Sequence, residues 1–425
     1  MYAVSNLVDR ECPDSAQLHL CARQPVGLRP STRPMIQPVT SISSLIDVAS
    51  AALRTWSGGE ARWFAAAPGR INLIGEHTDY NAGWVLPMAI DRYTLLAAAP
   101  GAVAGTVRAY SLSLEEQGDL PLEDLGTAHA FPWMRYVQGV VAECATRGIE
   151  SPALDVVIVS SLPAGGGLSS SAALELATAH LLQAVVGQSL SVADRIEACV
   201  AAEREYAGVP CGVMDQTIVE RGLEGHALLL DCGRDVATPI PLSSESVAMI
   251  AIHCGVAHEL AQGAYGQRRE ECATAAKMLG VATLRDATLD ALVSLKSDDT
   301  LYRRARHVVT ENGRVRLAVA ALKNGDWSRL GRLMLDSHMS LKEDYAVSCD
   351  ELDLLVDLAL AESGVYGARM TGGGFGGCMI VLADRARAEA VADAICSRYG
   401  AQTGREPLCY QLESAAGAGE LCATL

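Results

Sequence analysis

Hydrophobic positions recur with helical spacing in some segments of the chain and with strand spacing in others. Between Ser44 and Thr55, the apolar side chains of Leu45, Val48 and Leu53 fall on one side of a helix. Leu154–Ser160 contains four consecutive β-branched residues, as is typical of a buried strand. The same criteria predict further strands at 62–67, 70–74, 92–99, 106–110, 227–231, 247–254, 368–370, 378–383 and 406–412, and we expect those at 92–99 and 106–110 to pair. Further helices are predicted at 133–145, 171–186, 191–206, 386–398, from about 214, and over most of 255–360.

This mixture of elements indicates an α+β fold in two domains. The first half is richer in strands and the second in helices, so we place a boundary near residue 240 and predict domains at 41–240 and 241–425. A chain of 425 residues is long enough for two domains of about 100–200 residues each. Residues 1–40 carry five prolines and no regular period, and we interpret them as a disordered extension.

The charge of the chain restricts its partners. Half of the residues are hydrophobic, which is ample for a large core, and 50 acidic against 34 basic residues give a formal charge of −16. Such an acidic chain is a poor match for non-specific binding to nucleic acid or to an anionic membrane. An anionic ligand must therefore be bound locally, by an arginine, a metal ion or a helix N-terminus.

Cysteine usage indicates a reducing compartment. The 13 cysteines are scattered, and none forms a C-x-x-C pair, so we expect reduced thiols, a cytoplasmic location and no structural zinc site. The longest uncharged stretch, Val156–Leu174, is interrupted by a proline and three glycines and does not read as a membrane helix. The N-terminus also lacks the pattern of a signal peptide.

A glycine- and serine-rich loop lies between the predicted strand at 154–160 and the helix at 171–186. Its glycines let the backbone approach a ligand, and the helix after it presents free N–H groups, which together favour a phosphate site. A simple turn in which a serine caps the helix is the alternative interpretation. The candidate phosphate residues are Gly165, Gly166, Gly167, Leu168, Ser169, Ser170 and Ser171.

The loop contains no lysine, so a nucleotide bound there needs a divalent ion. Magnesium prefers oxygen ligands, and Ser171 can offer its hydroxyl group. Glu203 falls on the apolar face of its predicted helix and can supply a carboxylate. Glu175, one turn after Ser171, is the competing ligand. A salt bridge to an arginine, or a position at the rim of the helix, is the alternative for Glu203.

A second polar loop follows the predicted strand at 70–74. Glu76, His77 and Asp79 lie close together there, beside Tyr80 and Asn81. Carboxylates, an imidazole and an amide can together bind several hydroxyl groups, as a sugar requires. A metal site and a solvated turn remain alternatives.

Three segments resemble a known family. Gly69–Ile90 is similar to the galactokinase signature, and Pro163–Ala173 resembles the phosphate motif shared by galactokinases, homoserine kinases, mevalonate kinases and phosphomevalonate kinases. Gly367–Cys378 resembles the third, glycine-rich motif of that family, and the resemblance extends from about Ser41 to Leu412. It implies an ATP-dependent sugar 1-kinase of the two-domain small-molecule kinase fold, with its active site in the cleft between the domains.

The resemblance also implies roles for individual residues in binding and phosphorylating the sugar. Asp215 matches the base that faces the C1 hydroxyl group, and Arg70 matches the basic residue beside it; a helix N-cap is the alternative role for Asp215. The positions that match sugar-binding residues are Glu76, His77, Asp79, Gly212 and Tyr265.

Further roles concern the nucleotide. Ser171 and Glu203 match the magnesium positions, which favours Glu203 over Glu175. Trp133 and Tyr136 match aromatic residues near the adenine, with ordinary core packing as the alternative. The third motif offers no side chain for proton transfer, so its glycines are expected to close a tight loop over the site, or else to form a structural bulge.

We expect galactose, ATP and Mg²⁺ as ligands, a monomer, and neither a nucleic-acid nor a membrane partner. Some relatives bind sugar and nucleotide only as sensors and lack a Ser-Ala pair after the glycine motif. Ser171 and Ala172 are present in this chain, which favours an enzyme. A kinase for N-acetylgalactosamine or arabinose is the remaining alternative.

Overall fold

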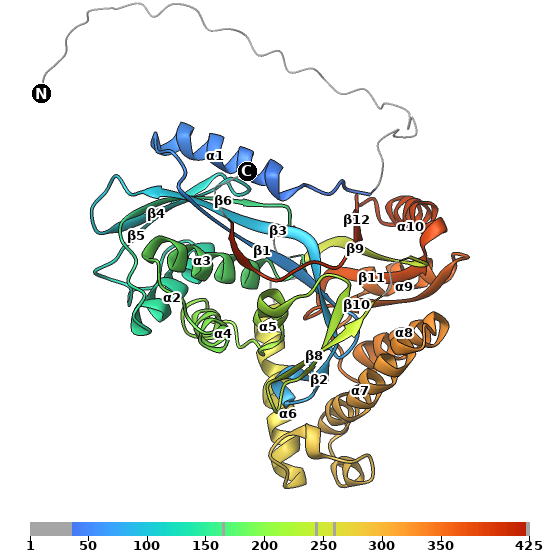
Figure 1. Cartoon of the computed structure of the whole chain (residues 1–425). Helices are drawn as coiled ribbons and strands as arrows, with labels where there is room; N and C mark the ends of the chain where they lie inside the picture. Colours follow the sequence, from blue (N-terminus) through green and yellow to red (C-terminus); the bar gives the residue numbers. More distant parts are fainter. Residues whose placement is uncertain (1–35, 164–165, 243–244, 258–260, 422–425) are drawn as a thin grey trace, which may run out of the picture. The chain divides into compact units, whose positions relative to one another are not determined.

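The computed structural model describes residues 36–163, 166–242, 245–257 and 261–421 (Figure 1). Most of the predicted extension at 1–40 therefore lies outside the described residues. Ile36 and Gln37 lie inside them, and the Gln37 amide donates a 2.7 Å hydrogen bond to the Cys409 carbonyl. The segment just before the first helix is thus joined to a strand near the other end of the chain.

The first sheet is built mainly from the first part of the chain. Its strands are β1 (Trp63–Asn72), β3 (Pro87–Pro100), β4 (Thr106–Ser111), β5 (Glu116–Pro121), β6 (Leu154–Ser160) and β13 (Gly419–Leu421). They run in the order β13-β1-β3-β6-β4-β5, and all described pairs are antiparallel except β4 with β6. The pairing register of β1 shifts between Pro68 and Gly69, which re-aims the residues that follow.

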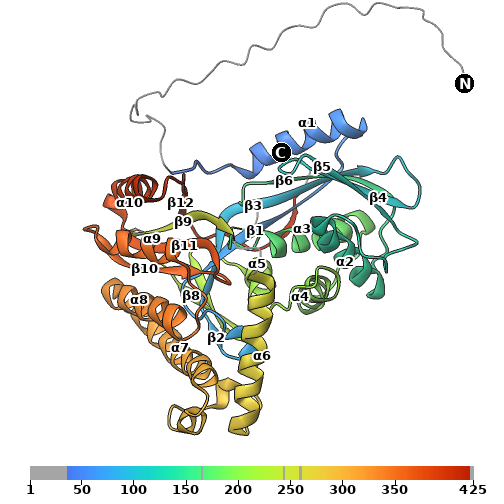
Figure 2. The same ribbon diagram turned by 180° about the vertical axis from the view of Figure 1, so that it is seen from behind.

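Helices cover both faces of this sheet (Figures 1 and 2). Helix α1 (Ile42–Ser57) buries Leu45, Ala49 and Leu53 against one face. Helices α2 (Pro132–Thr146) and α3 (Ser170–Val186) pack on the other. Alternate side chains of β6 point to opposite faces of the sheet. Val157 packs in the cluster with α1, and its neighbours Val156 and Ile158 belong to the core around α2 and α3.

The second sheet comes from later residues. It consists of β9 (Val247–Ala257), β10 (Val365–Thr371), β11 (Gly376–Asp384) and β12 (Leu408–Leu412), in the antiparallel order β10-β11-β9-β12. Helices α9 (Asp350–Leu360) and α10 (Ala388–Thr403) pack on it, and α8 (Trp327–Glu343) lies along β10. A small third sheet joins β2 (Trp84–Val85), β7 (His226–Asp231) and β8 (Val236–Pro241).

The remaining helices connect these layers. They are α4 (Val192–Ala201), the π-helical turn Ala202–Tyr206, α5 (Met214–Arg221), α6 (Ala261–Leu279) and α7 (Asp299–Lys323), with short 3-10 helices at Asp79–Asn81, Leu284–Asp286, Ala291–Leu295 and Arg385–Arg387. None of the helices in the described segments is both long and apolar enough to cross a bilayer.

The α+β fold and most predicted elements are confirmed, and three expectations are corrected. The strands predicted at 62–67 and 70–74 form one strand, β1, because the chain continues pairing through the register shift. The strands at 92–99 and 106–110 are not partners, since β6 lies between them. The helix predicted at 191–206 becomes a π-helical turn after Ala201. The domain boundary near 240 stays a prediction.

Candidate functional site

The centre of the site is an arginine–aspartate pair. Arg70 follows the register shift in β1, and Asp215 lies in the first turn of α5. The Arg70 Nε donates to Asp215 Oδ1 at 2.8 Å, and its Nη2 donates to Oδ2 at 2.6 Å. The helix cap of α5 is Val213, and Asp215 binds side chains instead.

Two further contacts tie this pair to the phosphate loop. The Ser169 hydroxyl group donates a short hydrogen bond to Asp215, and Arg70 Nη1 donates to the Gly167 carbonyl at 2.6 Å. Burial by itself lowers the pKa of the Arg70 guanidinium, but the charges of Asp215 and Glu76 outweigh burial and hold that pKa above its usual value. Arg70 therefore remains a cation at the junction of the two loops.

A cavity of about 130 Å³ opens beside the pair. Its walls come from segments far apart in the sequence: the loop after β1, the loop before α5, helix α6 and the loop between β10 and β11. All of the predicted sugar-binding and catalytic residues line it, namely Arg70, Glu76, His77, Asp79, Gly212, Asp215 and Tyr265, together with Glu203, Val209, Cys211, Met214, Gly372 and Gly373.

Asp79 and Gly212 meet in one wall of this cavity. A Cβ atom on Gly212 would overlap the Asp79 carboxylate, so this close approach requires a glycine. Burial, with a contribution from the charge of Asp215, raises the pKa of Asp79 to about 6. The carboxylate is therefore ionised at pH 7 and able to accept from hydroxyl groups.

His77 forms part of an aromatic wall. Its backbone adopts a left-handed φ of 62°, and its Nδ1 lies 2.9 Å from the Tyr80 hydroxyl oxygen. Burial lowers the pKa of His77 to about 3, so the ring is neutral. Its buried Nε2 has no hydrogen-bond partner among the described residues, which leaves it available to a ligand. The Tyr265 ring lies 5.4 Å from that of His77.

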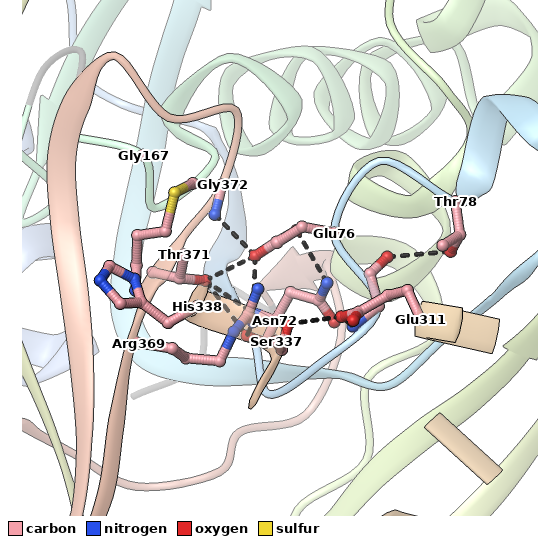
Figure 3. Close-up of polar contacts among 12 residues, drawn as sticks. Asn72, Glu76, Thr78, Gly167, Glu311, Ser337, His338, Arg369, Thr371 and Gly372 are labelled. Carbon is pink, nitrogen blue, oxygen red and sulfur yellow. Dashed lines mark hydrogen bonds and ion pairs between the residues drawn. The ribbon is translucent and has the colours of Figure 1, made fainter. Parts of the chain in front are cut away.

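The Glu76 carboxylate accepts hydrogen bonds from four residues of the chain itself (Figure 3). Its Oε2 accepts from Asn72 Nδ2 at 2.8 Å, and its Oε1 accepts from the Gly372 amide at 2.8 Å. The Thr371 hydroxyl group and Arg369 Nη1 also reach Oε1, at 3.2 and 3.4 Å. These partners connect Glu76 to the third glycine motif, and its predicted contact with a sugar stays a prediction.

The phosphate loop leads directly into α3. Gly165 lies outside the described residues; Gly166 and Gly167 precede the fully buried Leu168, and Ser170 begins the helix. Ser169 makes no side-chain capping bond, since its hydroxyl group binds Asp215. The first N–H groups of α3 therefore receive no serine cap from Ser169, contrary to the simple-turn interpretation.

The two candidate carboxylate ligands, Glu203 and Glu175, meet at Gln216. Its amide nitrogen donates to Glu203 Oε2 at 2.5 Å and to Glu175 Oε2 at 2.9 Å. Burial raises the pKa of both carboxyl groups; the charge of Glu203 adds to the shift at Glu175, and the charge of Asp215 to that at Glu203. Within the described residues, Glu203 forms no salt bridge with an arginine, so the structure does not support that alternative.

A divalent ion fits this group. Glu175 Oε1 is buried and has no hydrogen-bond partner in the described part of the chain, and Ser171 lies within hydrogen-bonding reach of Glu203. No group of three or more His, Cys, Asp or Glu residues placed to hold a metal is found in the described segments. An ion here would therefore need ligand oxygens, such as phosphate, in addition to Ser171 and Glu203.

A second cavity, of about 360 Å³, adjoins the start of α3. Trp133 and Tyr136 line it together with Ser170 and Ser171, so the aromatic pair is next to the phosphate loop and not confined to the core. The Trp133 indole N–H donates to Glu116 at 2.8 Å, which fixes the ring. A cavity lined by aromatic and aliphatic side chains together with serine and threonine hydroxyl groups suits a flat heterocycle joined to phosphates.

Sequence reasoning missed several polar residues of the site. Gln216 bridges the two carboxylates, and Arg369 and Thr371 hold Glu76. A charged side chain between Ala368 and Met370 in a predicted strand is the signal that would have pointed to Arg369. Nothing in the local pattern distinguishes Gln216 from an exposed helix residue.

Family models and known protein sequences all relate this chain to galactokinases and GHMP kinases. The model of the "Galactokinase galactose-binding signature" matches residues 56–100, that of "GHMP kinases N terminal domain" residues 135–222, and that of "GHMP kinases C terminal" residues 318–401. The chain is 42% identical to the galactokinase of Homo sapiens over 392 residues, which cover 90% of this chain and 98% of that protein. It is 40% identical to the galactokinase of Streptomyces coelicolor over 372 residues, covering 86% and 95% of the two chains.

Solved structures of a galactokinase and of a mevalonate kinase are also similar to this chain. The crystal structure of Lactococcus lactis galactokinase complexed with galactose matches with a TM-score of 0.83 at 30% identity, covering 89% of this chain and all of that one (100%). A crystal structure of mevalonate kinase matches with a TM-score of 0.57 at 16% identity, covering 83% and 98% of the two chains, and shares the fold.

Proposed function

The chain belongs to the galactokinase family within the GHMP kinases, and from this premise we propose that its site transfers the γ-phosphoryl group of ATP to the C1 hydroxyl group of D-galactose. The products are galactose 1-phosphate and ADP. The observation that carries the proposal is the Arg70–Asp215 pair, which lines the 130 Å³ cavity and contacts the phosphate loop through Gly167 and Ser169.

Asp215 is the proposed base. A sugar in the cavity presents its C1 hydroxyl group to the carboxylate, which takes the proton as the phosphoryl group arrives. Phosphoryl transfer passes through a loose transition state in which the proton can leave late, so a carboxylate held by Arg70 is sufficient. The Arg70 guanidinium also stabilises the charge on the transferring group.

The walls of the cavity orient the sugar. Asp79 accepts from hydroxyl groups, and His77 offers a neutral Nε2 with no partner in the described residues. Gly212 leaves the space that Asp79 needs, and Tyr265 supplies an apolar ring face. Glu76 is the remaining sugar-binding residue of the proposal.

ATP occupies the second cavity and the phosphate loop in this proposal. Trp133 and Tyr136 contact the adenine, and the backbone of Gly166, Gly167 and the start of α3 bind the phosphates. Gly165, Leu168, Ser169 and Ser170 complete that loop. Ser171 and Glu203 would hold Mg²⁺, which when bound neutralises phosphate charge.

A sugar panel tests the function. Purified protein with ATP and magnesium should convert galactose to galactose 1-phosphate, detected as a new ³¹P resonance coupled to the anomeric proton. Glucose, which differs in the orientation of its C4 hydroxyl group, should turn over at least about 10²-fold less efficiently, because cavity groups placed for one epimer are left unpaired by the other. Equal turnover of glucose, N-acetylgalactosamine or arabinose would contradict the proposal, and binding without turnover would indicate a sensor.

We also propose a cytoplasmic enzyme that acts as a monomer. All of the proposed sugar-binding and catalytic groups come from a single chain, so none has to be supplied by a second copy. Light scattering at assay concentrations should give the mass of one chain, 44.7 kDa.

A further inference from the structure

A fully buried arginine lies behind the sugar cavity. Arg369 in β10 has no exposed surface, yet only one of its nitrogens is satisfied: Nη1 donates to the Asn72 carbonyl at 2.9 Å and approaches Glu76 Oε1 at 3.4 Å. Its Nε and Nη2 have no partner among the described residues. Burying a guanidinium in this way costs several kcal/mol, and core packing alone does not require it.

The same arginine belongs to a network that holds the polar loop after β1. We call Asn72, Glu76, Arg369, Thr371 and Gly372 the buried bridge (Figure 3). Besides the contacts of Glu76, the Asn72 amide donates to the Thr371 hydroxyl oxygen at 3.1 Å. The residues that make these hydrogen bonds are all less than a tenth exposed, so the buried bridge lies inside the protein.

Helices α7 and α8 support the same loop from behind. Glu311 Oε1 accepts from the Gly75 amide at 2.9 Å and from the Ser337 hydroxyl group at 2.6 Å. The His307 Nε2 lies 3.1 Å from the Glu76 carbonyl oxygen. His77 has a positive φ of 62°, which costs energy for a residue other than glycine, so contacts from outside help the loop to keep this conformation.

The buried bridge ends at the phosphate loop. Gly372, whose amide is bound by Glu76, lies so close to the phosphate loop that a Cβ atom on it would be 3.1 Å from the Gly167 carbonyl oxygen. That same oxygen accepts from Arg70, the partner of Asp215. Glu76 thus binds Gly372, Gly372 lies beside Gly167, and Gly167 binds Arg70, so neighbouring groups lead from the sugar cavity to the Arg70–Asp215 pair.

We propose that Arg369 and Thr371 are positioning residues of the phosphoryl transfer, which fix Glu76 so that the sugar cavity and the phosphate loop keep one relative geometry. They touch neither the sugar nor the nucleotide. The inference rests on the proposed function, because it assigns the two ends of the bridge to galactose and to ATP.

A positioning role and a purely structural role can be distinguished because they change different measurable quantities. A structural arginine affects the fraction of folded protein, whereas a positioning arginine changes sugar affinity and rate in molecules that are folded. Arg92 is a suitable control: it is also buried, with 1% exposure, and binds Asp91 and the Gln37 and Gln411 carbonyls outside the cavity lining.

The experiment compares Arg369→Met, Arg369→Lys, Thr371→Val and Arg92→Met with the unaltered chain. Galactose affinity is measured by calorimetry without ATP, kcat and both KM values by a coupled assay, and the folded fraction by circular dichroism. Arg369→Met should raise the galactose Kd and lower kcat, each at least tenfold per folded molecule. Thr371→Val should do so to a smaller extent, and Arg369→Lys should recover part of the loss. Arg92→Met should lower the melting temperature and leave Kd and kcat within twofold.

Unchanged Kd and kcat in folded Arg369→Met, or losses of the same size in Arg92→Met, would overturn the positioning role. If Arg369→Met does not fold, Thr371→Val and Arg369→Lys decide: normal Kd and kcat in both overturn the inference, and a rise in Kd together with a fall in kcat supports it. Failure of the unaltered chain to phosphorylate galactose would refute the proposed function. This outcome is distinct from a failure of the positioning inference, which is judged by comparing the variants with the unaltered chain.

Discussion

Asp215 accepts hydrogen bonds from Arg70 and Ser169, and these contacts determine what its removal should do. Asp215→Asn keeps the shape of the side chain but cannot take a proton, so kcat should fall by at least about 10²-fold. The protein should stay folded and bind galactose, with some loss of melting temperature because the buried Arg70 loses its anionic partner. Steady-state kinetics and thermal melting check this.

Arg70→Ala is the companion variant. It should also lose turnover, and it should lose stability because Asp215 is left without its guanidinium partner. An Asp215→Asn protein that melts early with near-normal kcat would show that Asp215 is structural and that the base lies elsewhere.

Asp79 provides a pH test. Its folded pKa of about 6 lies above the ordinary 3.8, so the folded protein retains the proton between roughly pH 4 and pH 6. The stability contribution of this group therefore falls as pH rises through that window, whereas sugar binding by the ionised carboxylate increases. We expect kcat/KM for galactose to rise with an apparent pKa near 6 and to level off above it. Asp79→Asn should lack this step; its persistence there would assign the titration to another group.

Substitution can show which of the two carboxylates bound by Gln216, Glu203 or Glu175, is the magnesium ligand. Glu203→Gln should raise the magnesium concentration needed for half-maximal turnover by at least tenfold, while galactose affinity measured without metal stays within about twofold, since Glu203 offers oxygen to the ion. Glu175→Gln should have the smaller effect on magnesium. The reverse order of the two variants would make Glu175 the ligand.

Between elements, helix α8 approaches strand β10 very closely at a pair of glycines. A Cβ atom on Gly331 would overlap the Tyr366 carbonyl, and Gly367 faces Gly331 in return. Gly331→Ala should therefore destabilise the protein by about 1–3 kcal/mol, although alanine is the better helix former. It should also lower kcat, because β10 carries Arg369 and Thr371.

Gly313 in α7 is the matched control, since nothing lies within 4 Å of a Cβ atom placed there. Gly313→Ala should stabilise by about 1 kcal/mol through helix propensity alone. Urea denaturation of both variants measures the difference, and equal stability of the two would mean that α8 and β10 separate easily.

Elements with strong periodicity could be predicted from the sequence. The segment Leu154–Ser160 matches β6, and the helix predicted at 133–145 matches α2 to within one residue at each end. Strands β2 and β13 are too short, with two and three residues, to produce a pattern. The π-helical turn depends on tertiary contacts, because a one-residue expansion leaves no mark on the apolar spacing.

In the candidate site, too, features that depend on long-range contacts could not be predicted from the sequence. Motif resemblance placed Arg70, Asp79 and Asp215 together, and the structure brings them to one cavity. It could not show that Glu76 binds the third glycine motif, since that contact joins positions almost 300 residues apart. Long-range pairing of single polar residues has no local signature.

For the whole molecule, the proline-rich beginning offers a truncation test. Deleting residues 1–34 should leave kcat and the melting temperature nearly unchanged, because the segment has no apolar period. Deleting 1–40 should lower the melting temperature by a few degrees, since it removes the Gln37 contacts with Cys409 and Arg92. A large loss in the shorter deletion would show that the first 34 residues bind to the folded protein.

The last described strand has a consequence for synthesis on the ribosome. Strands β1 to β6 have all been translated by residue 160, but among the described residues the outer edge of β1 is paired by β13 alone, at Gly419–Leu421. At about 5–20 residues per second, the intervening residues take roughly 10–50 s to be made. Throughout that time, the nascent chain presents an open strand edge to its neighbours on the same polysome. Slower translation lengthens this exposure, so we expect it to lower the yield of folded protein unless chaperones shield the edge.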